Sequence, residues 1–265
     1  MASPFLNPSR PTRLLAYASL WLALSAIAQP AQQPPAPTAR QPVLVELFTS
    51  EGCSDCPPAD ALLARLDSTQ FVPNAQAIVL SEHVTYWNHL GWRNPFSFDA
   101  MSERQSHYSN QFLLDEVYTP QMVVDGAQQF VGSDATALSR AVANAAGKPK
   151  LQIAIQTAHL ADGAIHFSVK GAANAKAKLV IALAEDATHS EVARGENAGR
   201  TLHHISVVRN LKELDSNSAD GRELQLAVPA LSGRDKAIGP IRLVVFFADR
   251  RSGHVLGVAE QTISR

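Results

Sequence analysis

Cys53 and Cys56 are the only cysteines in this chain of 265 residues, and two residues separate them. A cysteine sulfur can attack a disulfide, bind a soft metal ion or form a disulfide of its own. A disulfide that closes so small a ring would stabilise the fold by only about 2 kcal/mol, because little chain entropy is removed. We therefore favour thiol–disulfide exchange as the chemistry of the pair. Half of a metal site and an inert disulfide are the alternatives.

In an exchange reaction, Cys53 would attack the partner disulfide and Cys56 would resolve the mixed disulfide. Two prolines follow, beginning with Pro57. Because a residue before proline resists the α conformation, we expect the helix to begin at one of these prolines and the cysteines to lie in the turn ahead of it. Glu51 and Asp55 are anionic, and anions near a thiolate raise its pKa. We therefore expect Cys53 to be only modestly acidified, and the protein to be a weak oxidant.

The residues around the pair predict a parallel strand–helix–strand unit. Apolar runs over residues 43–48 and 77–80 predict two buried strands, and apolar residues at helical spacing over 59–66 predict the helix between them. The following elements are a helix over 99–114 after an aromatic-rich segment, a hairpin over 121–125 and 128–131, and a helix from an N-cap at Asp134 to Gly147. This order predicts an α/β thioredoxin-like domain over residues 43–148 with a helical, aromatic-rich insertion.

The pattern changes at Lys150, after which helical periodicity is largely lost. Seven short segments predict strands: 151–156, 165–169, 178–184, 202–208, 223–228, 241–247 and 255–259. A series of short strands with alternating apolar and polar residues is typical of an antiparallel sandwich. We therefore expect an all-β, sandwich-like domain over residues 150–265.

The first 28 residues have the pattern of a secretory signal peptide. Arg10 and Arg13 precede an apolar stretch over residues 14–28, and small residues close that stretch. The stretch is shorter than the roughly 20 residues that span a bilayer, so we expect cleavage near Ala28 and a periplasmic or secreted protein. Residues 29–42 contain five prolines and predict a disordered linker.

Removal of the leader leaves 21 basic and 24 acidic residues, a net charge of −3. Such mild acidity gives no electrostatic reason to expect nucleic acid or an anionic membrane as a partner.

Two further residues belong to the predicted redox site. Thr119-Pro120 precedes the first hairpin strand, where thioredoxin-like folds place a cis-proline beside the cysteines, so we expect a cis bond there. The alternative is an ordinary proline at the start of a strand. Glu46 interrupts an apolar strand, and a lone buried carboxylate is costly. Thioredoxins keep an acid behind the cysteines as a proton acceptor, so Glu46 is a candidate for that role. Alternatively, it ends a strand and faces solvent or a lysine.

His83, Tyr86 and Trp87 follow the second strand, at the carboxyl end of the sheet where α/β sites gather. His83 could move protons, or bind copper together with the two thiolates. A histidine packed under the aromatic segment is the interpretation we favour, with the aromatic residues as the core of the insertion. The adjacent His203 and His204 point to opposite faces of a predicted strand, which favours a structural role for that segment.

Three segments resemble the secreted thioredoxin-like family catalogued as domain of unknown function 1223: residues 46–60, 118–126 and 195–209. A histidine- and tryptophan-containing motif of the family is present, but Thr85 and Asn88 replace its two acids. The resemblance implies a bacterial envelope protein of thioredoxin-like fold and supplies no substrate.

These observations predict an exported thiol–disulfide oxidoreductase that acts on protein or small-molecule disulfides. Cys53 would be the nucleophile, Cys56 the resolving thiol and Glu46 the proton acceptor, while Thr119 and Pro120 would shape the groove. We expect no organic cofactor, and we expect thiol- or disulfide-bearing envelope proteins, a redox partner among them, as partners. The alternatives are a copper-binding or copper-delivery protein and a binding module with a vestigial redox motif.

Overall fold

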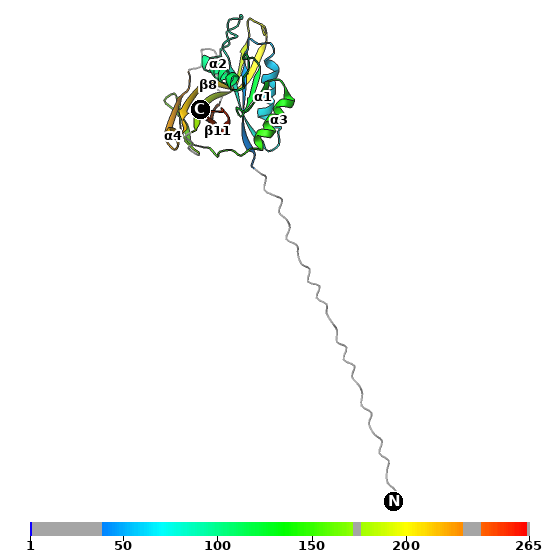
Figure 1. Ribbon diagram of the computed structural model, residues 1–265, viewed down its shortest axis with the longest axis vertical. Helices are drawn as coiled ribbons and strands as arrows, with labels where there is room; N and C mark the ends of the chain where they lie inside the picture. Colours follow the sequence, from blue (N-terminus) through cyan, green and yellow to red (C-terminus); the bar gives the residue numbers. More distant parts are fainter. Residues whose placement is uncertain (2–38, 172–175, 230–239, 264–265) are drawn as a thin grey trace. The chain divides into compact units, whose positions relative to one another are not determined.

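The computed structural model describes Met1 and residues 39–171, 176–229 and 240–263. Beyond Met1, the predicted signal peptide over residues 1–28 lies outside the described residues, as does the linker up to residue 38. The described residues form eleven strands and four helices (Figure 1). In chain order these are β1 (Gln41–Thr49), α1 (Pro57–Thr69), β2 (Ala75–His83), α2 (Asp99–Gln111), β3 (Gln121–Val124), β4 (Gln128–Val131), α3 (Ala135–Ala146), β5 (Ala154–Ala161), β6 (Ala164–Lys170), β7 (Ala177–Glu191), β8 (Thr201–Asp215), α4 (Ser216–Ala219), β9 (Glu223–Ala227), β10 (Ile241–Asp249) and β11 (Val255–Ile263).

Eight of these strands form one mixed sheet in the order β11-β10-β7-β8-β2-β1-β3-β4. Strands β1 and β2 are parallel, and β2 is also parallel to β8, with Ser81 opposite Val207. The remaining neighbours in this sheet are antiparallel. A second, antiparallel sheet has the order β5-β6-β9.

The expected architecture, an α/β thioredoxin-like domain followed by a separate sandwich-like domain, is wrong. Strands β7, β8, β10 and β11 from the second half continue the sheet that begins with β1 and β2, so the fold is mostly β with one large mixed sheet. The physical reason lies in β2, whose residues are nearly all buried. Buried backbone groups need hydrogen-bond partners, and β8 supplies them at the outer edge of β2. The apolar pattern of β2 indicates burial but does not identify its neighbour.

The two faces of the large sheet bury different elements. Helices α1 and α3 cover one face, where their apolar residues pack on Val43, Val45 and Leu47 of β1. Helix α2 lies on the other face, where Met101 packs beside Leu44 of β1; Figure 1 shows α2 apart from α1 and α3. The small sheet packs its β6 residues against β7 and β10. The first of these faces carries the start of α1, and therefore the cysteine pair.

Most local elements were predicted correctly. The hairpin is formed by β3 and β4, and α3 begins after Asp134, whose carboxylate accepts hydrogen bonds from the amides of Thr136 and Ala137. All seven strands expected after Lys150 are present, as β5 to β11. No helix among the described residues is long and apolar enough to cross a membrane.

Candidate functional site

The two cysteines lie in the turn between β1 and α1. The helix begins at Pro57 and Cys56 is its N-cap, as the proline pair predicted. The amide of Cys56 donates to the carbonyl of Cys53 at 3.3 Å, and the amide of Asp60 donates to the carbonyl of Cys56 at 3.1 Å. Both cysteines are free thiols. The chain therefore presents a reduced pair at the start of a helix, where amide donors and the helix dipole favour an anion.

The two thiols have very different environments. The pKa of Cys53 is lowered to about 7, first by its hydrogen bond with Cys56 and then by that with Thr119, against the opposing effect of burial. Burial raises the pKa of the Cys56 thiol far above its ordinary value, and the hydrogen bond to Cys53 raises it further. Cys53 is therefore the thiol that ionises near neutral pH, while Cys56 keeps its proton.

The peptide bond between Thr119 and Pro120 is cis, as expected, and it lies beside the pair. The Sγ of Cys53 is 3.8 Å from the Thr119 carbonyl oxygen. Trp87 positions this residue, because its Nε1 donates to Thr119 Oγ1 at 2.8 Å. A cavity of about 440 Å³ adjoins the turn. Its lining consists of Ser54, Asp55, Pro58, Tyr118, Thr119, Pro120, Val131 and Ser133.

Trp87 and Tyr86 were expected to form only the core of an insertion, but both reach the site. A Cβ atom on Gly52 would lie 3.1 Å from Cβ of Trp87, so Trp87 packs directly on the cysteine turn. Burial raises the pKa of Tyr86 to about 12, and the charges of Cys56 and Cys53 contribute to that rise.

Glu46 is not part of the cysteine site. Its fully buried carboxylate accepts hydrogen bonds from Arg104 Nε at 2.7 Å and from Tyr108 Oη at 2.6 Å, both on α2. Helix α2 covers the face of the sheet opposite α1. Because side chains alternate between faces along a strand, Glu46 faces α2 while Val45 and Leu47 face α1.

His83 is buried and its two ring nitrogens already have partners. Asn94 Nδ2 donates to Nδ1 at 2.7 Å, and Nε2 lies 3.2 Å from Ser81 Oγ. Burial, followed by the charges of His204 and Arg209, holds the pKa of His83 well below its usual range. Among the residues that the structure describes, no three His, Cys, Asp or Glu side chains are grouped to hold a metal ion. The geometry therefore gives no support to a copper site of Cys53, Cys56 and His83.

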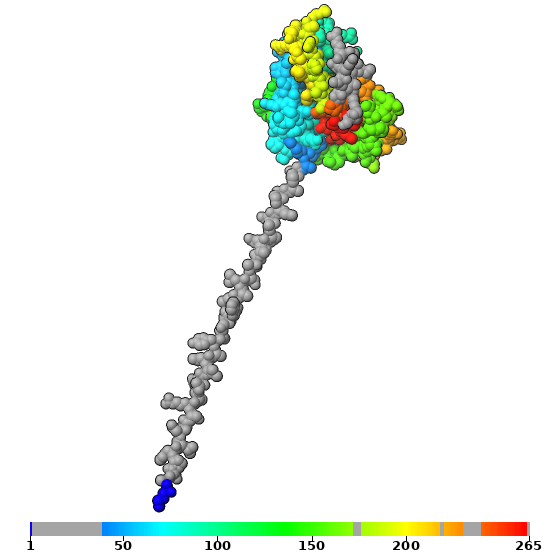
Figure 2. Space-filling view, turned by 180° about the vertical axis from the view of Figure 1, so that it is seen from behind, coloured from blue at the N-terminus to red at the C-terminus, as the bar shows by residue number. Residues whose placement is uncertain are grey.

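The loop between β7 and β8 closes over the cysteine turn, a contact that sequence reasoning missed. Asn197 is fully buried, and its Nδ2 donates to the carbonyls of Glu51 at 2.9 Å and Cys53 at 2.8 Å. Glu196 Oε2 accepts from the amide of Ser54 at 2.9 Å. In Figure 2 the yellow surface of this segment lies against the cyan surface of the first half. The one available signal was the resemblance of residues 195–209 to the family pattern.

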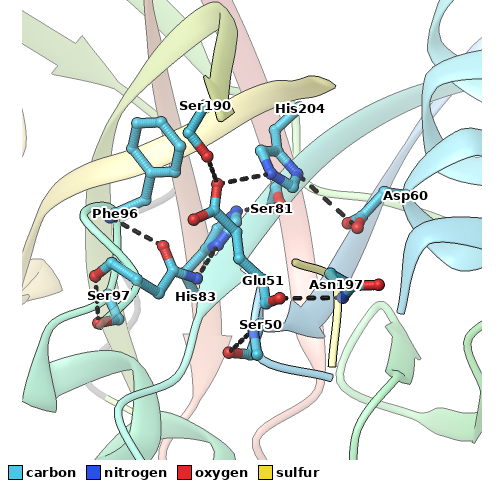
Figure 3. Close-up of polar contacts among 12 residues, drawn as sticks. Ser50, Glu51, Asp60, Ser81, His83, Phe96, Ser97, Ser190, Asn197 and His204 are labelled. Atoms are coloured by element: carbon cyan, nitrogen blue, oxygen red, sulfur yellow. Dashed lines mark hydrogen bonds and ion pairs between the residues drawn. The ribbon is translucent and has the colours of Figure 1, made fainter. Parts of the chain in front are cut away.

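Three buried ionisable side chains lie behind the turn (Figure 3). Nε2 of His204 on β8 is 3.2 Å from Oε1 of Glu51, and its Nδ1 is 3.7 Å from Oδ2 of Asp60 on α1. Burial alone would lower the pKa of His204, but its interactions with the Asp60 and Glu51 carboxylates outweigh that effect and raise the pKa to about 9. His204 is therefore an imidazolium held between two carboxylates at neutral pH.

Glu51 does not act on Cys53 in the way its position suggested. Its carboxylate accepts hydrogen bonds from Trp92 Nε1 at 2.8 Å, from Ser190 Oγ and from His204. Burial opposes ionisation of Glu51, but these bonds outweigh it and lower the pKa. The Glu51 carboxylate therefore forms its ion pair with His204. As expected, His204 and its neighbour His203 face opposite ways, with His204 buried and His203 exposed.

A family model described as "Protein of unknown function (DUF1223)" matches residues 44–246. The chain belongs to this family. A comparison with curated proteins finds no match. Among solved structures, the chain is similar to an X-ray crystal structure of a protein from Agrobacterium tumefaciens, a structural-genomics target. The two chains are 25% identical, the TM-score is 0.59, and the match covers 82% of this chain and 92% of the other. The comparisons thus give this DUF1223 protein a family and a structural relative, and neither description names an activity.

In this DUF1223 protein, replacing Asn197 by alanine is expected to lower the free energy of unfolding by about 1–3 kcal/mol, because the buried carbonyls of Glu51 and Cys53 each lose a donor. Urea unfolding measures the loss. Asn210→Ala is the control, since the side chain of Asn210 makes a single, solvent-exposed hydrogen bond within the described residues, to the Ala227 carbonyl. This substitution should change the free energy of unfolding by less than about 0.5 kcal/mol. Equal losses in the two variants would contradict a special role for Asn197.

Proposed function

We propose that the protein is a thiol–disulfide oxidoreductase in which Cys53 is the nucleophile and Cys56 the resolving thiol. The observation that carries the proposal is a pair of unequal thiols at the start of a helix. The pKa of Cys53 is lowered and that of Cys56 is raised. Cys53 Sγ lies 3.8 Å from the carbonyl oxygen of Thr119, whose peptide bond to Pro120 is cis. A low-pKa thiol forms the attacking thiolate, and a neighbouring thiol completes the exchange.

The reaction balances without any further reagent. The Cys53 thiolate attacks one sulfur of a substrate disulfide, a new S–S bond forms, and the other substrate sulfur leaves as a thiolate. Cys56 then loses its proton and attacks Cys53 Sγ, which releases the second substrate sulfur. The protein dithiol loses two electrons, and the substrate disulfide gains them.

The substrate would approach along the cavity of about 440 Å³ beside Pro120. The Cys53 side chain is 2% exposed, so a large partner must displace side chains around the turn before it reaches the sulfur. Small disulfides face a lower barrier than folded proteins do. The modest shift of the Cys53 pKa supports a weak oxidant rather than a strong one.

We also propose export from the cytoplasm, on the leader pattern of residues 1–28. An oxidising compartment offers disulfide-bearing envelope proteins as partners.

Insulin reduction by dithiothreitol tests the function. The wild-type protein should accelerate the reaction, and Cys53→Ala should return it to the uncatalysed rate because the attacking sulfur is gone. Reduced Cys56→Ser protein, mixed with insulin without dithiothreitol, should stop at a mixed disulfide, visible as a larger species under non-reducing conditions. A Cys53→Ala protein as active as the wild type would refute the proposal. That result would favour the alternative of a binding module with a vestigial cysteine motif.

A further inference from the structure

The exchange reaction described above leaves the buried Glu51–His204–Asp60 cluster unused. All three side chains are at least nine-tenths buried. Buried polar atoms are normally hydrogen-bonded, yet Oδ1 of Asp60 and Nδ1 of His204 have no hydrogen-bond partner among the described residues. An orphaned carboxylate oxygen behind a reactive thiol pair calls for a role.

Asp60 lies one helical turn beyond Cys56. Residues four apart on a helix occupy the same face, and the amide of Asp60 donates to the carbonyl of Cys56 at 3.1 Å. The two groups also interact electrostatically, since the charge of Asp60 contributes to the raised pKa of Cys56. Asp60 is thus the first carboxylate of α1, and it lies on the same face as Cys56.

We propose that Asp60 accepts the proton of Cys56 during resolution of the mixed disulfide, and that His204 is the residue that positions Asp60. The inference rests on the proposed oxidoreductase function and names its proton acceptor. His204 holds Oδ2 of Asp60 and leaves Oδ1 free. The second half of the chain, through β8, therefore takes part in the chemistry of a cysteine pair in the first half.

The step is balanced as follows. The S–H bond of Cys56 breaks and its proton moves to Oδ1 of Asp60. The sulfur of Cys56 forms a bond to Sγ of Cys53, and the bond between Cys53 and the substrate sulfur breaks. The electron pair leaves on the substrate thiolate, which takes up a proton from Asp60 or from water.

Several other groups face the cluster. His83 of β2 meets the ring of His204 edge-to-face, with the ring centroids 4.6 Å apart, and it stays neutral because burial lowers its pKa. Arg209 of β8 adds a positive charge near His83. Ser190 and Trp92 contribute neutral donors. The two cysteines also face the cluster. Both carboxylate oxygens of Glu51 accept hydrogen bonds, whereas Oδ1 of Asp60 has no hydrogen-bond partner among the described residues.

Reaction of the full-length dithiol with excess dithiodipyridine separates the two steps. The first thiopyridone equivalent reports the attack by Cys53, and the second reports resolution by Cys56. Asp60→Asn should leave the first phase at the wild-type rate and slow the second about a hundredfold, a usual contribution of a general base. Its second phase should then rise about tenfold per pH unit, because hydroxide must replace the lost base. Asp60→Glu should restore much of the rate, and His204→Gln should slow only the second phase.

Asp67→Asn is the matched control, because it removes a carboxylate from the same helix that pairs with Arg242. It should leave both phases unchanged. If Asp60→Asn and His204→Gln both resolve at the wild-type rate and pH dependence, the inference is overturned while the oxidoreductase stands. If the wild type releases no second equivalent, the proposed function itself fails. Should Asp60→Asn not fold, His204→Gln and Asp60→Glu decide the question by the same second phase.

Discussion

Replacing Arg104 by methionine is expected to lower the free energy of unfolding by about 3–5 kcal/mol, the usual cost of breaking one side of a buried ion pair. Arg104 is 11% exposed and holds the fully buried Glu46 through its Nε and Nη2. It also lies 3.6 Å from Glu82 and 3.8 Å from Glu213. Methionine keeps much of the length of the side chain, so the loss reports charge rather than volume. Chemical denaturation at neutral pH is the measurement.

The loss should report mainly the ion pair between Arg104 and Glu46. Burial and the neighbouring Glu46 raise the pKa of Glu82 well above its usual range, so Glu82 already carries a proton and Glu46 is the carboxylate that needs a counter-charge. Arg65→Met is the control, since Arg65 is exposed and stacks over Phe71 with its Cζ 5.0 Å from the ring centroid. If Arg65→Met lowered the free energy of unfolding by a similar amount, the effect of Arg104→Met would be explained by lost packing on an aromatic ring and not by the ion pair.

The second large effect is the pH dependence of stability through His204. Its pKa is about 9 in the folded protein and about 6.5 in the unfolded chain. A raised histidine pKa contributes stability that is fully present below pH 6.5 and is lost as the pH rises through 9. The contribution is on the order of 3 kcal/mol, at about 1.4 kcal/mol per pH unit. His204→Gln should therefore be destabilised most at low pH, with the difference shrinking toward pH 9.

The comparison is best made in a Cys53→Ala background. The pKa of Cys53 is lowered to about 7, so its titration increases stability as the pH rises and opposes the effect of His204. Guanidinium unfolding at a series of pH values gives the difference between the two proteins. His203→Gln is the matched control, because His203 is the next residue on β8 and faces solvent. A destabilisation by His204→Gln that does not change with pH would contradict an imidazolium at this position.

The candidate site joins segments that are far apart in the sequence. The cysteine turn follows β1, Thr119 and Pro120 precede β3, and Asn197 and His204 come from the loop before β8 and from β8 itself. Loss of any one segment would leave polar groups at the site without their partners, so the site depends on all three segments. All three segments lie within the family match over residues 44–246.

The local features of this protein follow from its sequence. The proline pair places the start of α1, Asp134 caps α3, and alternation of apolar residues locates β5 to β11, because each depends on neighbours within a few residues. The cis Thr119–Pro120 bond was expected from its place before the hairpin, where thioredoxin-like folds have a cis-proline, and not from the local sequence.

The tertiary structure alone decided which strands are neighbours and which acids lie behind the cysteine turn. A buried apolar strand such as β2 can pair with any compatible edge, so the sequence did not reveal that β8 lies beside it. That pairing brings His204 to Asp60 and Glu51, whereas Glu46, the acid that the sequence offered as a candidate, faces α2. Along a strand, alternate residues point to opposite faces of the sheet, so the sequence indicates which residues share a face. Which element covers each face is decided by packing between segments that are distant in the sequence.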